Sequence, residues 1–200
     1  MSSSPMPAAG APDPAPPGLA SPGLASPAPA VRLVPLAMEH LPLVMTWVND
    51  REVMQYFANR QTHISQEEEA GYLKTLTASR NDRAWSVFDA AGEPSERTYV
   101  GQCSVNNIYW PARNGRLFVV VRREAQGKGY GPAAVRALLD VAWGKELDLH
   151  KLWLIVRRDN RAAQAMYLRL GFDFEGVLKD EYCVNGQYYD MVRMSILRPG

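Results

Sequence analysis

The sequence predicts an α/β fold in which one mixed, mostly antiparallel sheet carries helices on both faces. First, strand-like runs and stretches of helical period follow one another in the order β-α-α-β-β-β-α-β-α-β-β. Second, Asn-Gly dipeptides lie between neighbouring strand runs and predict hairpins, which join antiparallel strands. Third, 200 residues with 46% hydrophobic content can form one well-buried core. A single domain spanning residues 31–200 is therefore expected.

The elements are predicted in the following order. The strands are Val31–Leu36, Ala84–Ala90, Tyr99–Ile108, Leu117–Val121, Leu152–Val156 and a final hairpin, Phe172–Leu197. The helices are Glu39–Asn49, a segment opened by the capping box of Ser65 and Glu68, Pro132–Leu147, and Asn160–Leu170, which Gly171 closes. The predicted hairpin turns are Asn114-Gly115 and Asn185-Gly186.

Residues 1–30 have a different composition from the rest of the chain. They are almost entirely Pro, Ala, Ser and Gly, and contain the short repeat Gly-Leu-Ala-Ser-Pro. Such a segment buries too little apolar surface to offset its ordering entropy, and its prolines disfavour helix and strand. We expect a disordered, solvated tail.

Charge and composition exclude several classes of partner. The 22 basic and 21 acidic residues are mixed along the chain, so no field favours nucleic acid or an anionic membrane. No apolar run approaches the ~20 residues needed to cross a bilayer, and no basic-then-apolar leader is present, which predicts a cytoplasmic protein. Two cysteines and three isolated histidines predict no metal site.

The most informative stretch lies between an apolar strand run ending at Val121 and a helix beginning near Pro132. A glycine-rich turn at a helix N-terminus lets backbone N–H groups face an anion, and the helix dipole adds partial positive charge. We therefore predict a diphosphate site, although a tight structural turn would also explain three alternating glycines. The stretch reads Gln126, Gly127, Lys128, Gly129, Tyr130, Gly131.

Two common nucleotide motifs do not fit this loop. The phosphate loop of nucleotide hydrolases is excluded because no Gly-Lys-Ser/Thr follows the glycines. A dinucleotide fold would place its glycine loop after the first strand, with an acidic residue at the end of the next strand. Here the loop comes late in the chain, and Val156 is followed by Arg157.

The loop resembles the acyl-CoA diphosphate motif of the GNAT superfamily of N-acetyltransferases, Q/R-x-x-G-x-G/A, which Gln126, Gly129 and Gly131 satisfy. Downstream, Leu152–Val156 followed by Asn160, Ala163, Tyr167 and Gly171-Phe172 is similar to the second CoA segment of that superfamily. The resemblance covers residues 31–197. It implies acetyl-CoA as acetyl donor, transfer to an amine, and a homo-oligomer.

Within the superfamily, the chain is most similar to the branch that acetylates spermidine, ribosomal-protein N-termini or amino sugars. The segments 50–56, 174–182, Asn185-Gly186 and Arg193-Met194 carry this similarity. They leave the acceptor open. The loop Phe57–Ser65 lacks the acidic and aromatic residues associated with polyamine enzymes, so spermidine itself is not singled out.

The resemblance assigns a catalytic role to one residue and a CoA-binding role to another. Tyr167 is expected to protonate the departing CoA thiolate, and Asn160 to contact the CoA arm. They lie seven residues apart, on one face of a helix. Backbone N–H groups near Val121 are expected to polarise the acetyl carbonyl in a slot between two splayed strands. As alternatives, Tyr167 is a core aromatic and Asn160 only a helix N-cap.

The general base is not identified by any motif. Many relatives keep a glutamate at the start of the fourth strand, whereas this chain reads Asn-Gly-Arg-Leu-Phe from Asn114. We therefore expect a relay of ordered water to remove the amine proton, with Glu52 and Glu181 as the remaining candidates. Both are otherwise solvated carboxylates.

Aromatic side chains in the same segments are expected to hold the acceptor. Trp47, Tyr56 and Tyr182 could pack on an alkyl amine or a sugar ring, and Trp47 could equally belong to the core. The expected acceptor is a small primary amine of the polyamine or amino-sugar type. The alternatives are a protein N-terminus, such as that of a ribosomal protein, and a CoA-binding module without catalysis.

Overall fold

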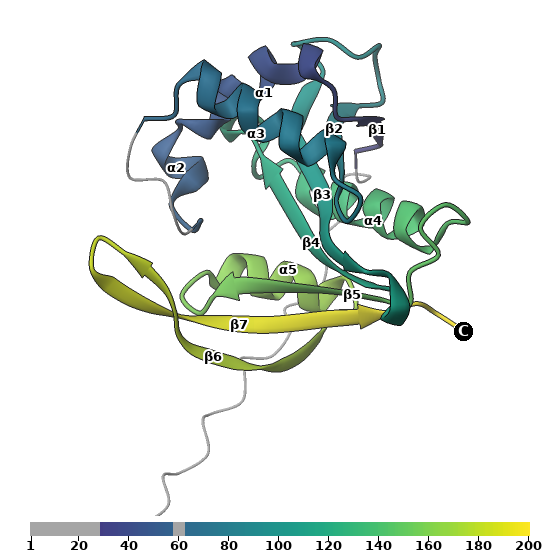
Figure 1. Ribbon diagram of the computed structural model, residues 1–200, viewed down its shortest axis with the longest axis vertical. Helices are drawn as coiled ribbons and strands as arrows, with labels where there is room; N and C mark the ends of the chain where they lie inside the picture. Colours follow the sequence, from purple (N-terminus) through teal and green to yellow (C-terminus); the bar gives the residue numbers. More distant parts are fainter. Residues whose placement is uncertain (1–28, 58–62) are drawn as a thin grey trace, which may run out of the picture.

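The computed structural model describes residues 29–57 and 63–200. These residues form a seven-stranded sheet with the order β1-β2-β3-β4-β5-β7-β6, shown in Figure 1. All neighbouring strands are antiparallel except β4 and β5, which confirms the predicted mixed, mostly antiparallel sheet. The strands are β1 (Val31–Pro35), β2 (Arg83–Asp89), β3 (Tyr99–Tyr109), β4 (Asn114–Val121), β5 (Lys151–Arg157), β6 (Asp173–Val184) and β7 (Gln187–Leu197).

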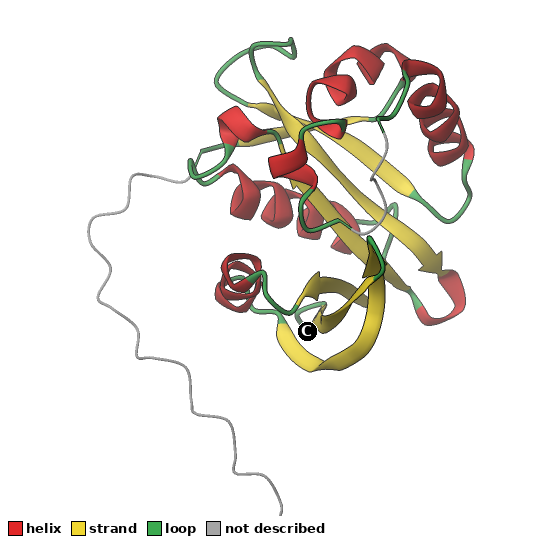
Figure 2. Cartoon of the chain, turned by 90° about the vertical axis from the view of Figure 1, so that its left-hand side faces the viewer, coloured by secondary structure: helices red, strands yellow, loops and turns green. Residues whose placement is uncertain are grey.

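Helices cover both faces of the sheet, as predicted, and Figure 2 shows the two layers. One hydrophobic cluster joins α1 and α3 to Phe88 of β2, and the other joins α4 and α5 to the adjacent Val87. Because successive strand residues face opposite sides, these two clusters lie on opposite faces. The helices are α1 (Leu41–Val48), α2 (Arg51–Met54), α3 (Gln66–Ala78), α4 (Tyr130–Trp143) and α5 (Arg161–Arg169).

Strands β4 and β5 pair only at their beginnings. The parallel pairing joins Asn114–Arg116 to Lys151–Trp153 and stops there. From Leu117 to Val121 the edge of β4 has no partner on the β5 side among the described strands, and Figure 1 shows β4 and β5 diverging. This splaying was predicted, and it positions the candidate site described below.

The predicted turn at Asn114-Gly115 is wrong, because both residues already belong to β4. The chain reverses direction just before Asn114, through a 3₁₀ turn at Trp110–Ala112 and through Arg113, which has a left-handed φ of 48°. Gly115 has a packing role instead. A Cβ at this position would lie 2.5 Å from Cγ1 of Val105 on β3.

The second predicted turn is confirmed. Asn185 and Gly186 join β6 to β7 with φ angles of 51° and 75°. Two positive φ values at the centre of a two-residue loop are what this dipeptide favours. The capping box is also confirmed, because Ser65 and Glu68 each accept a hydrogen bond from the other's backbone N–H.

Helix boundaries differ from the prediction in three places. The predicted helix Glu39–Asn49 is a 3₁₀ turn at Met38–His40 followed by α1. The four-residue α2 was not predicted; the Asp50 carboxylate caps it by accepting from the N–H groups of Glu52 and Val53. Helix α4 ends at Trp143, before Gly144, although the buried Leu147 continues the apolar pattern.

The predicted tail, residues 1–30, lies outside the described residues except for Pro29 and Ala30. The carbonyl of Ala30 accepts a hydrogen bond from the N–H of Ala90, next to the first strand pair. No helix of the described residues is long and apolar enough to cross a membrane. These residues contain no group of three or more His, Cys, Asp or Glu side chains that could hold a metal ion.

Candidate active site

The diverging strands β4 and β5 enclose a slot of about 320 Å³. Its floor comes from Leu117–Val119 and from Leu154–Arg157, on the two strands that separate. Helices α1 and α3 contribute one wall, and α5 and the β6–β7 hairpin contribute the other. The slot brings together five of the residues singled out from the sequence: Trp47, Tyr56, Asn160, Tyr167 and Tyr182.

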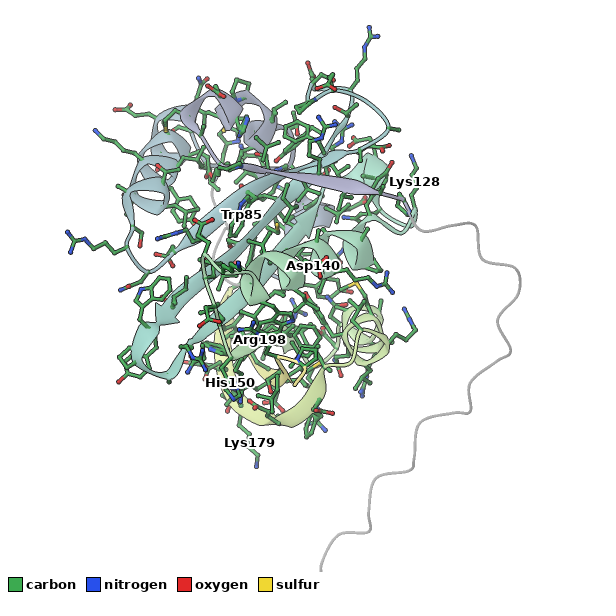
Figure 3. The ribbon with its side chains drawn as sticks, turned by 90° about the vertical axis from the view of Figure 1, so that its right-hand side faces the viewer. Trp85, Lys128, Asp140, His150, Lys179 and Arg198 are labelled. Atoms are coloured by element: carbon green, nitrogen blue, oxygen red, sulfur yellow. The ribbon has the colours of Figure 1, made fainter. Side chains whose placement is uncertain are left out.

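The glycine loop follows β4 and leads into α4. Gly127 and Gly129 have left-handed φ angles of 72° and 88°, and Gly129 is the N-cap residue of α4. Among the described residues, the N–H groups of Gly127, Lys128 and Gly129 donate to no backbone carbonyl. Uncommitted amides at the N-terminus of a 14-residue helix fit a diphosphate. Figure 3 shows Lys128 at this end of α4.

Side chains hold the loop against the sheet. Nε2 of Gln126 donates to the carbonyl oxygen of Val121 at 3.0 Å, which joins the loop to the end of β4. The Tyr130 hydroxyl donates to Oδ2 of Asp89 on β2 at 2.6 Å. This hydrogen bond lowers the pKa of Asp89 and raises that of Tyr130. Gln126 and Tyr130 therefore position the loop, in addition to any contact with a ligand.

Tyr167 lies on α5 and is buried, with its ring edge-on to Phe172 at 5.3 Å between centroids. Burial raises the pKa of Tyr167, because the charged phenolate would lose its hydration. The hydroxyl therefore keeps its proton at neutral pH. A protonated hydroxyl in the slot can donate to a leaving thiolate, but the ring also belongs to the hydrophobic core.

Asn160 occupies the N-cap position of α5. Its Oδ1 accepts a hydrogen bond from the N–H of Ala163 at 3.1 Å, so the capping alternative raised by the sequence describes what this oxygen does. Asn160 also lines the slot. The side-chain NH₂ makes no hydrogen bond to the described residues, and so this group is the one available to a ligand.

The three aromatic residues reach the slot from different elements. Trp47 of α1 is a core residue that also lines the slot, and its indole N–H donates to the Tyr99 hydroxyl at 2.9 Å. Tyr56 follows α2 and lies 5.3 Å under the guanidinium of Arg157. Tyr182 belongs to β6.

The two carboxylates considered as bases do not line the slot. The Glu52 carboxylate pairs with Arg123 at 2.9 Å and is largely exposed. Glu181 is exposed on β6. The fold therefore places neither carboxylate in the lining of the slot.

Among the slot residues that the sequence did not single out are Gln102, Asn106, Arg116 and Glu69. Glu69 is buried on α3, on the face that also carries Leu73 and Leu76. Its spacing of four and seven residues from these leucines is a helical pattern that could have identified it. The other three lie on one face of β3 and β4, and only the strand register places them there.

A family model described as "Acetyltransferase (GNAT) domain" matches residues 30–173. The spermidine N(1)-acetyltransferase of Escherichia coli K12 is 30% identical over 171 residues, which cover 86% of this chain and 88% of that enzyme. A putative ribosomal N-acetyltransferase of Bacillus subtilis is 31% identical over 108 residues, which cover 54% of this chain and 58% of that protein.

The fold also matches solved structures. The structure of spermidine N-acetyltransferase from Vibrio cholerae in complex with CoA and spermine superposes with a TM-score of 0.75 and 28% sequence identity. The match covers 84% of this chain and 95% of that one. Together with the slot and its glycine loop, these similarities show that the chain belongs to the GNAT acetyltransferase family and is an acetyl-CoA-dependent N-acetyltransferase.

Proposed function

We propose that this chain transfers the acetyl group of acetyl-CoA to a primary amine of a small molecule, of the polyamine or amino-sugar type, by direct attack in a ternary complex. The observation that carries the proposal is the slot itself. It runs between the unpaired edge of β4 and the helix that bears Tyr167, so two reactants can meet there. Holding both in one site lowers the entropic barrier to reaction.

The donor would be held by its diphosphate. The amides from Gly127 to Gly131, at the N-terminus of α4, provide hydrogen-bond donors and partial positive charge. Lys128 adds a full charge at the same end of the helix. Asn160 offers its side-chain NH₂ to the CoA arm.

Bond formation places negative charge on the acetyl carbonyl oxygen, and bond breaking places it on sulfur. Backbone N–H groups on the free edge of β4, up to Val121, would stabilise the first charge. The Tyr167 hydroxyl would give its proton to the thiolate. A tyrosine hydroxyl has a higher reference pKa, about 10, than a thiol, about 8.5, so this transfer is uphill, and Tyr167 must regain a proton from the ammonium that attack produces or from solvent.

The acceptor amine must lose a proton before it attacks. For an alkyl ammonium with a pKa of about 10.4, presenting the free base at pH 7 costs about 4.6 kcal/mol. We infer that ordered water carries the proton away. Glu69 is the one carboxylate among the described residues that line the slot, and the relay would end there. Trp47, Tyr56 and Tyr182 would contact the carbon skeleton of the acceptor.

Release of free thiol from acetyl-CoA, measured with a panel of amines and peptides, tests this function. The proposal expects turnover with at least one small amine. Tight binding of CoA without thiol release for any acceptor would contradict it and would leave a CoA-binding module.

A second candidate, acetylation of a protein N-terminus, is favoured by the similarity to the putative ribosomal N-acetyltransferase of Bacillus subtilis. Peptides in the same panel distinguish it, since faster turnover with a peptide than with any small amine would favour this function. For the intact protein we expect a homo-oligomer, and a monomeric mass in solution would contradict that expectation.

A further inference from the structure

Arg116 lines the slot and, among the described residues, has no carboxylate partner for its positive charge. It lies on β4 directly opposite Asn106 of β3 on one side and Trp153 of β5 on the other. This row crosses the last residue pair before β4 and β5 diverge. Arg116 therefore stands at the closed end of the slot, where a bound acceptor would be enclosed.

The guanidinium is held in place but not neutralised. Its Nη2 donates to the Tyr182 hydroxyl at 3.0 Å, and its central carbon lies 5.9 Å from the Trp153 ring centroid. Within the described chain, no carboxylate forms a salt bridge with it. The guanidinium of Arg193 also lies near this indole, 4.2 Å from the ring centroid, and it pairs with Glu175. Arg116 therefore lies near the same indole as Arg193 but, among the described residues, has no carboxylate corresponding to Glu175.

The other charged side chains that line the slot do not neutralise Arg116. Arg157 also lines it, but Asp159 accepts from both Nε and Nη2 of that side chain, and the carbonyl of Gln55 accepts from Nη1. Glu69 of α3 also lines the slot, and no salt bridge within the described chain joins it to Arg116. An arginine keeps its charge at any physiological pH, and a part-buried guanidinium is stabilised most by an oxyanion that it can bind with two hydrogen bonds.

The slot also contains two buried hydrogen-bond acceptors without donors among the described residues, and one of them, on Asn106, lies directly across from Arg116. Oε1 of Gln102 and Oδ1 of Asn106 are buried and have no partner among the described residues. Both side chains line the slot from one face of β3, and Asn106 is the cross-strand neighbour of Arg116. Buried carbonyl oxygens are nearly always satisfied in folded proteins, so an N–H donor from a ligand fits this position.

We propose that Arg116 binds a carboxylate or phosphate group of the acceptor, so that the substrate is an amine that also carries a negative charge. This inference rests on the proposed function and narrows it. An acidic amino sugar or an amino acid places its anion on Arg116 and an N–H group on Asn106, the cross-strand neighbour of Arg116. A polyamine without an anionic group brings only positive charge to the same guanidinium.

The test compares amines that differ only in the anionic group. Glucosamine 6-phosphate is compared with glucosamine for the phosphate, and lysine with cadaverine for the carboxylate. Thiol release from acetyl-CoA gives kcat/KM for each amine. We expect the anionic member of at least one pair to be favoured by about tenfold or more, the scale of a charge-assisted hydrogen bond. The pair that shows the preference identifies the anion.

Arg116→Gln should remove that preference, chiefly by raising KM for the anionic amine, and should leave the neutral member of the pair nearly unchanged. Arg32→Gln is the matched control, because Arg32 is exposed and pairs with Glu93 away from the slot. Thermal unfolding of both variants shows whether they fold. The comparison of anionic and neutral amines with the wild-type protein tests the proposal even if neither variant folds.

The possible results distinguish failure of the Arg116 role from failure of the proposed function. Turnover of neutral amines and polyamines that equals or exceeds that of the anionic amines would overturn the role of Arg116 and leave the proposed function intact. An Arg116→Gln variant that loses the same factor with both members of a pair would also overturn it. No turnover with any amine or peptide would overturn the proposed function and this inference together.

Discussion

Gln126 and Val121 are joined by a hydrogen bond of 3.0 Å, from the side-chain amide of the first to the backbone carbonyl of the second. The bond connects the first residue of the glycine loop to the last residue of β4. At this end β4 pairs with β3 but, among the described strands, has no partner on its β5 side. The hydrogen bond therefore links the site proposed for the diphosphate directly to the strand edge proposed to polarise the acetyl group.

Tyr167→Phe should lower kcat at least about tenfold and leave CoA affinity nearly unchanged, as expected for loss of a general acid. Because burial raises the pKa of Tyr167, ionisation of this residue should not reduce wild-type turnover below pH ~10. Steady-state rates between pH 6 and 10 and calorimetric titration with CoA provide the measurements. Unchanged kcat would remove Tyr167 from the mechanism.

Gly129→Val should weaken CoA binding by about tenfold or more, because its side chain would occupy the glycine loop and left-handed φ disfavours a β-branched residue. A Cβ there would also lie 3.0 Å from Cδ of Pro29. Gly186→Val is the matched control, since Gly186 has a φ of 75° in the β6–β7 turn, away from the loop. Equal CoA affinities for the two variants would refute the diphosphate site.

Glu69→Gln should reduce kcat with a small amine at pH 7 and leave CoA affinity unaltered. If Glu69 receives the amine proton through water, the deficit should shrink as the pH rises and the amine loses its proton unaided. A purely structural role would give the same deficit at every pH. Glu67→Gln, an exposed position on the same helix, serves as the control in the pH profile.

Glu175→Gln should destabilise the fold by about 1 kcal/mol at pH 7. The Glu175 carboxylate accepts hydrogen bonds from Lys151, Ser195 and Arg193, which hold its pKa at about 2, against an ordinary value of 4.5. A depressed pKa stabilises the folded state above pH 4.5, and this contribution is lost as the pH falls toward 2.

Urea unfolding of wild type and Glu175→Gln at pH 7 and at pH 3 measures this dependence, and the difference should be smaller at pH 3. Glu93→Gln is the control, because this carboxylate is 89% exposed in its pair with Arg32 and should contribute little. A constant difference between wild type and Glu175→Gln at both pH values would contradict the assignment.

Local signals in the sequence predicted the features that depend on neighbouring residues. The capping box of Ser65 and Glu68 and the turn at Asn185-Gly186 form as expected, because each depends on a few adjacent backbone groups. The glycine loop lies between β4 and α4 as predicted. The turn predicted at Asn114-Gly115 was wrong because Gly115 allows close packing against Val105 and does not form a turn. Only the fold reveals that contact.

The acceptor side of the slot was harder to predict. In the sequence, the segment that contains Arg116 stood out only because it lacks the glutamate that many relatives keep. The position of Arg116 opposite Asn106 depends on strand register, which no short motif specifies. Glu52 was considered because it lies in a segment shared with relatives, yet the fold pairs it with Arg123 outside the slot. Residues from α3, β3 and β6 meet only after the sheet forms.

A crystal structure of the protein with bound CoA tests the central claim most directly. The diphosphate should accept hydrogen bonds from backbone amides between Gly127 and Gly131, and the sulfur should lie within hydrogen-bonding distance of the Tyr167 hydroxyl. A diphosphate bound away from this loop, or a thiol far from Tyr167, would contradict the account.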